Sequence, residues 1–545
     1  MKKKIMTLLS FFVFCFVSFS AHSGQALYVD SVGDPVYWNN SSSNAISVHP
    51  ESGACGHFTN AQMLSLLQTN LQAWTDLDYV DLAFSVVPDV ISGVDGCNYA
   101  DYLVGVAGTT DAQDTANVND SINPVLFDND GNIIDLATGE SSGRYYILGF
   151  ASSAGFALNE AGTDYQYIID GQAVFNCYCL EDANGDPANS DCVDEEASRN
   201  ITFSTDDLDF TMIHEMGHFI NLDHSAANSD LVSDDDDDND AYIPTMYPQS
   251  VNPAEQKTPM QDDIMTISSL YPTSDFFTAG DADSSAYCKV TGSLLDRFGD
   301  YMRCAEVMFA NSTFSKSVSF VSGAYAQATD TSGDGYTDDD GECLSDCGAF
   351  EVYLEPGVEY SFTVNSINSS FYGGSSVGPC LVPLTACTND IIDECTDGVT
   401  TTSCTACVAN QTITKNAKNE NISSKILTNC TAGNTVSLGD INSLSVSSSS
   451  SGTETLIKGL VQNGANGSSV DQTKVLRNNG LYLNKPLYAI DCPESGGSSG
   501  GGGDSSSSSG CSLYTGNMAP SQVSLLSLLF ILALVFGVMR RAKQK

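Results

Sequence analysis

The chain has 545 residues, of which 42% are hydrophobic and 9% aromatic. This composition allows large buried cores and excludes a wholly disordered or fibrous chain. Acidic residues outnumber basic ones by 68 to 21, which gives a formal net charge of −47, and seven of the basic residues lie in the first four or last six positions. So acidic a surface repels nucleic acid and anionic lipid, and nucleic-acid binding is therefore excluded.

Residues 1–26 have the layout of a secretory signal peptide. A basic start is followed by an apolar run from Ile5 to Phe19 and then by small residues. This layout predicts export, with cleavage after Ser20, Ser23 or Ala26. An uncleaved N-terminal membrane anchor is the alternative.

Cysteine usage also indicates an exported protein. Of the 18 cysteines, one lies in the N-terminal apolar run, and most of the other 17 fall in clusters: Cys177, Cys179 and Cys192; Cys343 and Cys347; Cys395, Cys404 and Cys407. In an exported chain such clusters predict disulfides. Zinc clusters are the competing interpretation, but no His lies near the Cys404–Cys407 pair and no second Cys-x-x-Cys is present. Seventeen is odd, so one cysteine is left over.

Residues 27–273 alternate between strand-like and helix-like patterns. One expected helix, 59–76, carries Met63, Leu67, Leu71 and Trp74 at helical spacing. Strands are expected at 44–49, 79–87, 124–136, 145–150 and 168–176, and further helices at 210–222 and 261–271. This order predicts an α+β domain. After Thr273, short Val-, Thr- and Ser-rich runs separated by Gly, Asn and Asp predict all-β structure.

Half of the six histidines lie within eleven residues, in the segment TMIHEMGHFINLDHS at 211–225. His214 and His218 are four residues apart on an expected helix, so their rings project from one face and can share a metal ion. Asn221 lies where the chain must turn to return His224 as the third ligand. Three neutral imidazoles leave an open position on zinc, which is typical of a catalytic site, and Glu215 lies where it can act as general base on a water there. Surface histidines on an ordinary helix are the alternative.

This segment resembles the metzincin zinc peptidases, whose pattern is His-Glu-x-x-His-x-x-Gly-x-x-His followed by a methionine turn. Ile243–Pro248 (IPTMYP) resembles that turn, with Met246 under the metal site. Further resemblance to the matrixin branch lies in Leu222–Ser225, in 128–135 and 147–151, and in the expected helix that follows Pro259. The resemblance covers residues 30–273. It implies a metzincin-like zinc endopeptidase acting on proteins or peptides, with a twisted sheet, an active-site helix beneath it and often bound calcium.

The chain departs from the family pattern in three ways. Asn221 stands where the family has Gly, and Asn is the next most tolerant residue for a positive φ. No Cys-switch propeptide is visible. Two insertions are present, Cys177–Cys192 and the loop with Asp234–Asp238, and for the Asp run a solvated loop is favoured over a calcium site.

A second candidate metal site lies further along the chain. Oxygen donors occupy positions 1, 3, 5 and 9 of an EF-type loop, with Gly335 at position 6 and Gly341 in place of the Glu at position 12. The candidate calcium ligands are Asp330, Ser332, Asp334, Tyr336 and Asp338. An acidic turn is the alternative.

Residues 274–382 resemble carboxypeptidase-regulatory-like β-sandwich modules. The resemblance is carried by Thr291–Leu295, Val307–Ala310 and Phe350–Tyr360, where a Pro-Gly turn joins two late strands. It implies an all-β accessory domain without catalytic residues. Residues 383–494 form a Cys- and Ser-rich β region that resembles no family we recognise.

The last residues have three parts. Residues 495–512 are a Gly/Ser linker that ends in a Gly-Cys-Ser motif around Cys511, and 513–545 contain an apolar run, Val523–Met539, followed by a basic tail. The layout resembles the C-terminal sorting signals of bacterial surface proteins. It implies sorting machinery at the membrane that processes the chain at Cys511 and removes the transmembrane helix. A permanent single-pass anchor is the alternative.

The sequence therefore predicts an exported, surface-associated and monomeric zinc endopeptidase with an all-β accessory region. Two other functions remain open. One is a surface adhesin whose peptidase domain has decayed, and the other is a zinc hydrolase that does not cut peptides.

Overall fold

The computed structural model describes residues 25–442, apart from a few single positions and the segments 29–34, 40–43, 139–141, 159–164, 195–198, 234–238, 277–286, 296–300, 302–304, 325–347, 366–384, 387–406 and 409–410. The predicted signal peptide up to residue 24, the predicted calcium loop and everything after residue 442, including Cys511 and the expected membrane span, lie outside the described residues. Within the described part, no helix has the length and hydrophobicity to cross a membrane.

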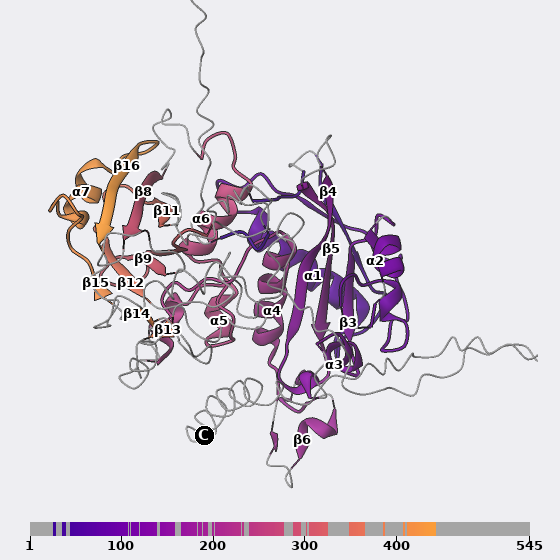
Figure 1. The fold of residues 1–545 in the computed structure, drawn as a ribbon. Coiled ribbons are helices and arrows are strands. Elements are labelled where there is room, and N and C mark those ends of the chain that lie inside the picture. The colour runs from indigo at the N-terminus through magenta and orange to yellow at the C-terminus, as the bar shows by residue number, and fades with distance from the viewer. Residues whose placement is uncertain are drawn as a thin grey trace, which may run out of the picture.

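A mixed β-sheet forms the centre of the N-terminal region (Figure 1). Among the described residues its strand order is β2-β1-β3-β5-β4, with parallel pairing from β2 to β5 and an antiparallel strand β4 at the edge. The strands are β1 (Ile46–Pro50), β2 (Phe84–Val86), β3 (Pro124–Asp128), β4 (Gly149–Leu158) and β5 (Tyr165–Asn176).

Helices pack against this sheet, and two further helices follow α4 along the chain. They are α1 (Asn60–Thr75), α2 (Asp111–Val118), α3 (Asn132–Thr138), α4 (Thr205–Phe219), α5 (Pro253–Gln256) and α6 (Gln261–Leu270). Short 3-10 turns lie at Tyr99–Asp101, Gly143–Tyr145, Ser190–Cys192, Leu231–Ser233 and Asp240–Tyr242, and a small hairpin joins β6 (Val193–Asp194) to β7 (Arg199–Asn200).

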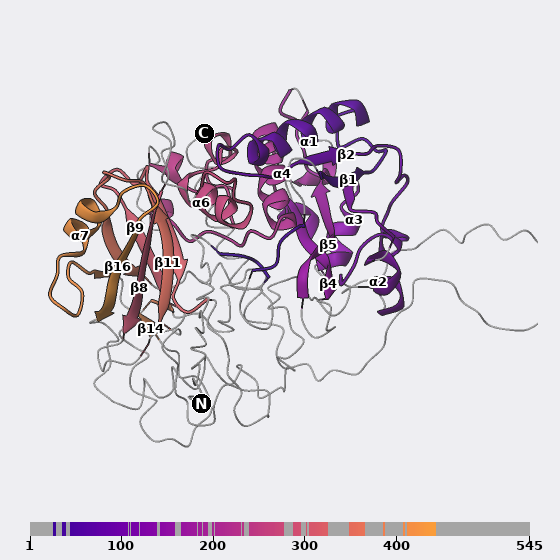
Figure 2. The same cartoon turned by 90° about the horizontal axis from the view of Figure 1, so that it is seen from above.

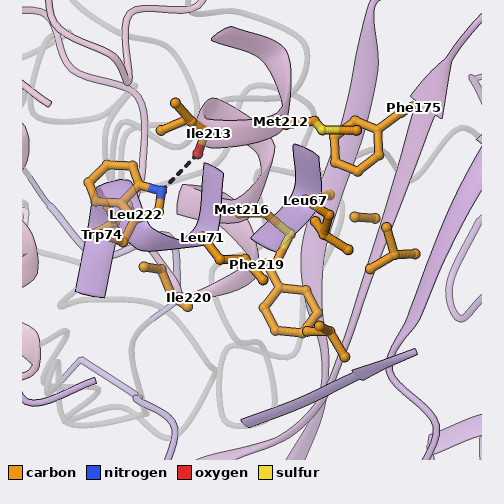
Figure 3. Close-up of a cluster of buried hydrophobic side chains, with 14 of the residues drawn as sticks. Leu67, Leu71, Trp74, Phe175, Met212, Ile213, Met216, Phe219, Ile220 and Leu222 are labelled. Atoms are coloured by element: carbon orange, nitrogen blue, oxygen red, sulfur yellow. Dashed lines mark hydrogen bonds between the residues drawn. The ribbon is translucent and has the colours of Figure 1, made fainter. Parts of the chain in front are cut away.

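Alternate residues of the central strands face opposite layers. Phe127 and Phe175 pack with α1 and α4, whereas Leu126 and Val174 pack with α3 and the turns near it. This alternation follows from the two-residue period of a strand buried on both faces. On the α1–α4 side the indole Nε1 of Trp74 donates a 2.9 Å hydrogen bond to the Ile213 carbonyl (Figure 3). Burying one such apolar side chain contributes about 1.5–3 kcal/mol, so this layer fixes α4 firmly on the sheet.

Helix α4 begins at Thr205, five residues before its expected start. Ser204 and Asp207 form a capping box, in which the Ser204 hydroxyl accepts the Asp207 N–H and the Asp207 carboxylate accepts the Ser204 N–H. This arrangement satisfies two N–H groups that a helix end otherwise leaves unpaired. The first turn is therefore polar, and the apolar periodicity used for the prediction begins only after it.

The strand expected over 124–136 is correct only in its first part. After β3 the chain turns at Gly131, which has a φ of +69°, and continues as α3. The buried Asp128 carboxylate accepts the Ile134 N–H at 2.7 Å, and this bond holds the start of the helix. The strand expected over 145–150 likewise begins only at Gly149.

The chain after Thr273 contains two sheets that share one core. This agrees with the prediction of β-structure in this part of the chain. In the described part of the chain, one sheet has the order β10-β9-β12-β15 and the other β11-β8-β16. The elements are β8 (Cys288–Leu295), β9 (Glu306–Ala310), β10 (Ser317–Val321), β11 (Ala349–Leu354), β12 (Ser361–Asn365), β13 (Thr385–Ala386), β14 (Cys407–Val408), β15 (Gln411–Thr412), α7 (Ile422–Asn429) and β16 (Thr435–Asn442).

The two sheets extend past the boundary predicted after residue 382. Strand β15 pairs with β12, and β16 pairs in parallel with β8. We refer to residues 287–442 as the sandwich region. Seen from above, it lies on one side of α6, and α4 with its sheet lies on the other (Figure 2).

Disulfides are confirmed for part of the predicted cysteine set. Among the described residues the pairs are Cys55–Cys177, Cys179–Cys192 and Cys288–Cys430. The first ties the loop between β1 and α1 to the residue after β5, and the last ties β8 to the residue after α7. Such bonds are typical of an oxidising compartment.

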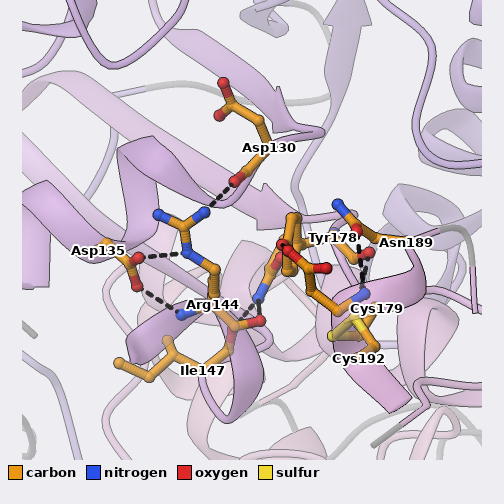
Figure 4. Close-up of a disulfide and its surroundings, with 10 residues drawn as sticks. Asp130, Asp135, Arg144, Ile147, Tyr178, Cys179, Asn189 and Cys192 are labelled. Atoms are coloured by element: carbon orange, nitrogen blue, oxygen red, sulfur yellow. Dashed lines mark hydrogen bonds and ion pairs between the residues drawn. A yellow bond between two sulfur atoms is a disulfide. The ribbon is translucent and has the colours of Figure 1, made fainter. Parts of the chain in front are cut away.

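Arg144 holds the loop that follows β3 (Figure 4). Its guanidinium pairs with the Asp135 carboxylate, donates to the Asp130 carbonyl at 2.7 Å and donates to the Asn132 side-chain oxygen at 2.8 Å. The Asp135 side chain is fully buried. Burial raises the pKa of Asp135, and the hydrogen bonds and charge of Arg144 oppose that rise. Arg144 thus supplies the positive charge that stabilises the buried Asp135 carboxylate.

We expect Arg144→Met to lower the free energy of unfolding by about 3–5 kcal/mol, because it leaves a buried carboxylate without its partner. Urea denaturation followed by fluorescence measures the change. Adding Asp135→Asn should recover part of the loss. Lys425→Met breaks an exposed ion pair with Glu420 and should cost far less. Equal losses in the two Met variants would contradict the structural role of Arg144.

Candidate metal site

Helix α4 presents two of the predicted metal ligands. His214 and His218 lie one turn apart, both are buried, and their ring centroids are 4.8 Å apart. The helix ends at Phe219, and the chain then reverses to bring His224 back toward them. The Nε2 atom of His224 lies 3.1 Å from the Nε2 atoms of both other rings. The structure therefore brings the three histidines together at one point.

Backbone carbonyls fix the orientation of the two helical rings. The Nδ1 atom of His214 lies 2.7 Å from the Thr245 carbonyl oxygen, and that of His218 lies 2.8 Å from the Leu222 carbonyl oxygen. A carbonyl only accepts, so Nδ1 carries the proton in both rings. The Nε2 lone pairs then point into the site, which is the arrangement that metal-binding histidines adopt.

Burial keeps these rings neutral. It lowers the pKa of His214 to about 3, with the charge of His218 contributing, and lowers that of His218 to about 4. Burial also lowers the pKa of His224. Converging lone pairs on neutral rings need a cation between them. Ligand atoms at about 2.0–2.1 Å around a tetrahedral metal stand roughly 3.3 Å apart, close to the observed separations, so this donor set fits a divalent metal.

Glu215 lies beside the histidines and is buried. Burial raises the pKa of Glu215 to about 8, and a hydrogen bond from the Ala151 N–H of β4 opposes the rise. Gly149 permits this closeness, because a Cβ there would lie 2.9 Å from the Val174 carbonyl and 3.2 Å from Glu215 Cγ. The carboxylate is thus held between α4 and the edge strand.

Met246 packs against the backbone of α4 between the two helical ligands. Its side chain is 2% exposed, and a Cβ added at Gly217 would lie 2.3 Å from its Sδ atom. The Asp263 carboxylate accepts the Thr245 and Met246 N–H groups at 2.9 and 3.0 Å. Neither Gly217 nor Asp263 is among the predicted site residues, although a Gly between two expected ligands is a usable sequence signal.

Asn221 adopts a φ of +74° at the chain reversal. Its side chain does more than tolerate that conformation. Oδ1 accepts the Tyr28 N–H at 2.7 Å, and Nδ2 donates to the carbonyls of Tyr28 at 2.9 Å and Val36 at 2.6 Å. The residue is completely buried. Asn221 therefore joins Tyr28 and Val36 to the turn between His218 and His224. The sequence did not predict this contact.

We expect Asn221→Gly to keep the turn but lower the free energy of unfolding by about 3 kcal/mol, because buried backbone groups of Tyr28 and Val36 lose their partners. Asn221→Val should be worse, since it also forces a β-branched residue to positive φ. Thermal and urea denaturation of both variants checks this order. A fully stable Gly variant would show that the side-chain bonds are dispensable.

Other predicted site residues lie outside the described residues. They are the candidate calcium ligands Asp330, Ser332, Asp334, Tyr336 and Asp338, the acidic run Asp234–Asp238, and Cys511. Their roles stay predictions.

Comparison with protein families and curated proteins assigns neither a family nor a function to the chain. The chain matches no protein-family model, and no curated protein matches it. The functional interpretation therefore depends on the geometry of this site and on the residues that build it.

Proposed function

We propose that the protein is a zinc-dependent endopeptidase of the metzincin type, with a matrixin-like catalytic region. The observation that carries the proposal is the convergence of His214, His218 and His224 at one point, with the buried Glu215 beside them. Met246 under the helix and Asn221 in the turn support the same assignment.

Zinc is the metal we assign to His214, His218 and His224. Imidazole also suits copper, nickel and iron, but three neutral histidines with an open fourth position are typical of catalytic zinc. When bound, zinc supplies a Lewis acid that polarises a carbonyl and lowers the pKa of water. The three histidines provide neutral donors, and backbone carbonyls orient the rings of His214 and His218.

Glu215 is the residue that would move the proton. Its carboxylate lies beside the three histidines, so it can take a proton from water there and deliver it to a leaving amine. Its Ala151 hydrogen bond keeps the side chain directed at the edge strand. Glu215 thus supplies both steps of proton transfer.

Strand β4 favours a peptide substrate over another hydrolysable bond. It is the edge of the central sheet in the described chain, and it lies next to Glu215. An extended peptide can pair with an edge strand through main-chain hydrogen bonds, whatever its side chains. That placement brings a peptide carbonyl toward the histidines. Sequence selectivity would then lie in the residues that follow Met246.

The remaining parts of the proposal concern location and partners. We infer an exported, surface-associated monomer that cleaves extracellular proteins or peptides, carries structural calcium in the 330–338 loop and is handled by C-terminal sorting machinery at Cys511. The competing adhesin function gains no support from the site, because three histidines that could hold a metal ion converge there.

We expect the purified protein to hold one zinc, and His224→Ala to abolish stoichiometric binding, because two histidines alone do not complete the donor set. Elemental analysis after dialysis measures this. The exposed His57 provides a matched control, and His57→Ala should retain full zinc. Full zinc in the His224 variant would overturn the metal assignment.

We expect Glu215→Ala to keep zinc and to lose about 10²–10⁴-fold in kcat, the usual contribution of a positioned general acid–base. Casein zymography with and without chelator, followed by kinetics on a peptide substrate, measures it. Glu359→Ala, at an exposed Glu of the sandwich region, should leave turnover intact. A near-native rate in the Glu215 variant would rule out its role as base. Chelator-insensitive cleavage of casein would rule out the zinc-peptidase proposal.

A further inference from the structure

Helix α6 carries two adjacent buried carboxylates that serve different parts of the molecule. Asp263 accepts N–H groups of the Met246 turn, as described above. Asp262 accepts the backbone N–H of Ser319 on β10 at 2.7 Å. Figures 1 and 2 both place α6 between the sandwich region and α4. The helix therefore contacts the metal site with one carboxylate and the sandwich region with the other.

Asp262 also reaches the metal loop. Its second carboxylate oxygen accepts the hydroxyl of Ser225, the residue directly after His224. The Asp262 residue is 1% exposed, so neither bond competes with bulk water. A single side chain thus joins the segment of the third metal ligand to a strand of the sandwich region.

Strand β10 is suited to this contact. It is the edge strand of the sheet β10-β9-β12-β15, so one row of its N–H groups points away from β9. Ser319 contributes one of these outward N–H groups, and Asp262 satisfies it. The carboxylate therefore covers part of an otherwise open sheet edge.

Apolar packing makes the same connection. Ala226 and Leu231, which follow the third ligand, share one core with Val307 of β9 and Val318 of β10. Asn228 donates from Nδ2 to the Phe314 carbonyl at 3.1 Å. The chain after His224 is therefore packed directly on the sandwich region.

We propose that Asp262 is a positioning residue for the third metal ligand, and that the sandwich region, through Ser319, is part of the support of the metal site. The inference rests on the proposed zinc site. Partners that orient metal ligands from outside the donor set typically change metal affinity by 10–100-fold when removed. Asp262 holds Ser225, and Ser225 fixes the backbone from which the His224 ring projects.

The test compares full-length variants by two measurements. Zinc affinity is measured in competition with a chromogenic chelator. The visible d–d spectrum, recorded after cobalt replaces zinc, reports ligand geometry. Asp262→Ala and Ser225→Ala should each weaken zinc binding by about 10–100-fold and alter the cobalt spectrum. Ser319→Pro removes the outward N–H and the side-chain hydroxyl, both of which bond Asp262, and should also weaken binding. Asp262→Asn can still accept the Ser319 N–H through its Oδ1, and its Nδ2 can donate to the Ser225 hydroxyl oxygen, so it should restore most of the affinity.

Ile426→Val provides the control, because it loosens a buried contact of α7, a helix that packs mainly on β16 and β12 and carries none of the bonds to Asp262. It should leave zinc affinity and the cobalt spectrum unchanged even where its Tm falls as far as that of the Ser319 variant. Unchanged affinity and spectrum in both Asp262→Ala and Ser225→Ala would overturn the inference. Equal weakening in Ile426→Val would overturn it too, because a general loss of stability would then explain the effect. If the unmodified protein binds no zinc, the proposed function itself fails.

Discussion

The reversal of the chain between His218 and His224 is the constraint on which the proposed metal site depends. A helix alone places two imidazoles on one face but cannot supply a third from the same side. Asn221, at a φ of +74°, turns the backbone within a few residues of the helix end. Its buried amide also binds the backbone of Tyr28 and Val36, so the turn is fixed by segments distant in sequence.

Local patterns were enough to predict the centre of the site. His214, Glu215 and His218 follow from helical spacing, and His224 follows from the need for a third ligand after a turn. The structure brings the three histidines together, because helical spacing aligns His214 and His218 and the turn at Asn221 returns His224. The coarse order of an α+β region followed by β-strands was predictable for the same reason, since hydrophobic period is a property of neighbouring residues.

What could not be predicted depends on contacts between distant residues or on polar signals outside the apolar period. The first turn of α4 is defined by the Ser204–Asp207 capping box, which precedes the hydrophobic pattern. The strand expected over 124–136 turns into a helix because Asp128 caps it from a buried position. The contact of Gly217 with Met246 and the bonds of Asn221 link segments that no window of sequence contains together.

The segment 221–225 is held by contacts with residues both far before it and far after it in the sequence, and this affects how the protein folds. Contacts between residues far apart in sequence form late, because the loop between them must be closed at an entropic cost. The loop around His224 contacts Tyr28, which is synthesised long before it. Through Asp262 of α6 it is also linked to β10, and both elements are synthesised after it. Helix α4 can therefore exist in a growing chain before its third ligand is fixed. Convergence of the three histidines then marks the completion of folding across both regions rather than an early event within one.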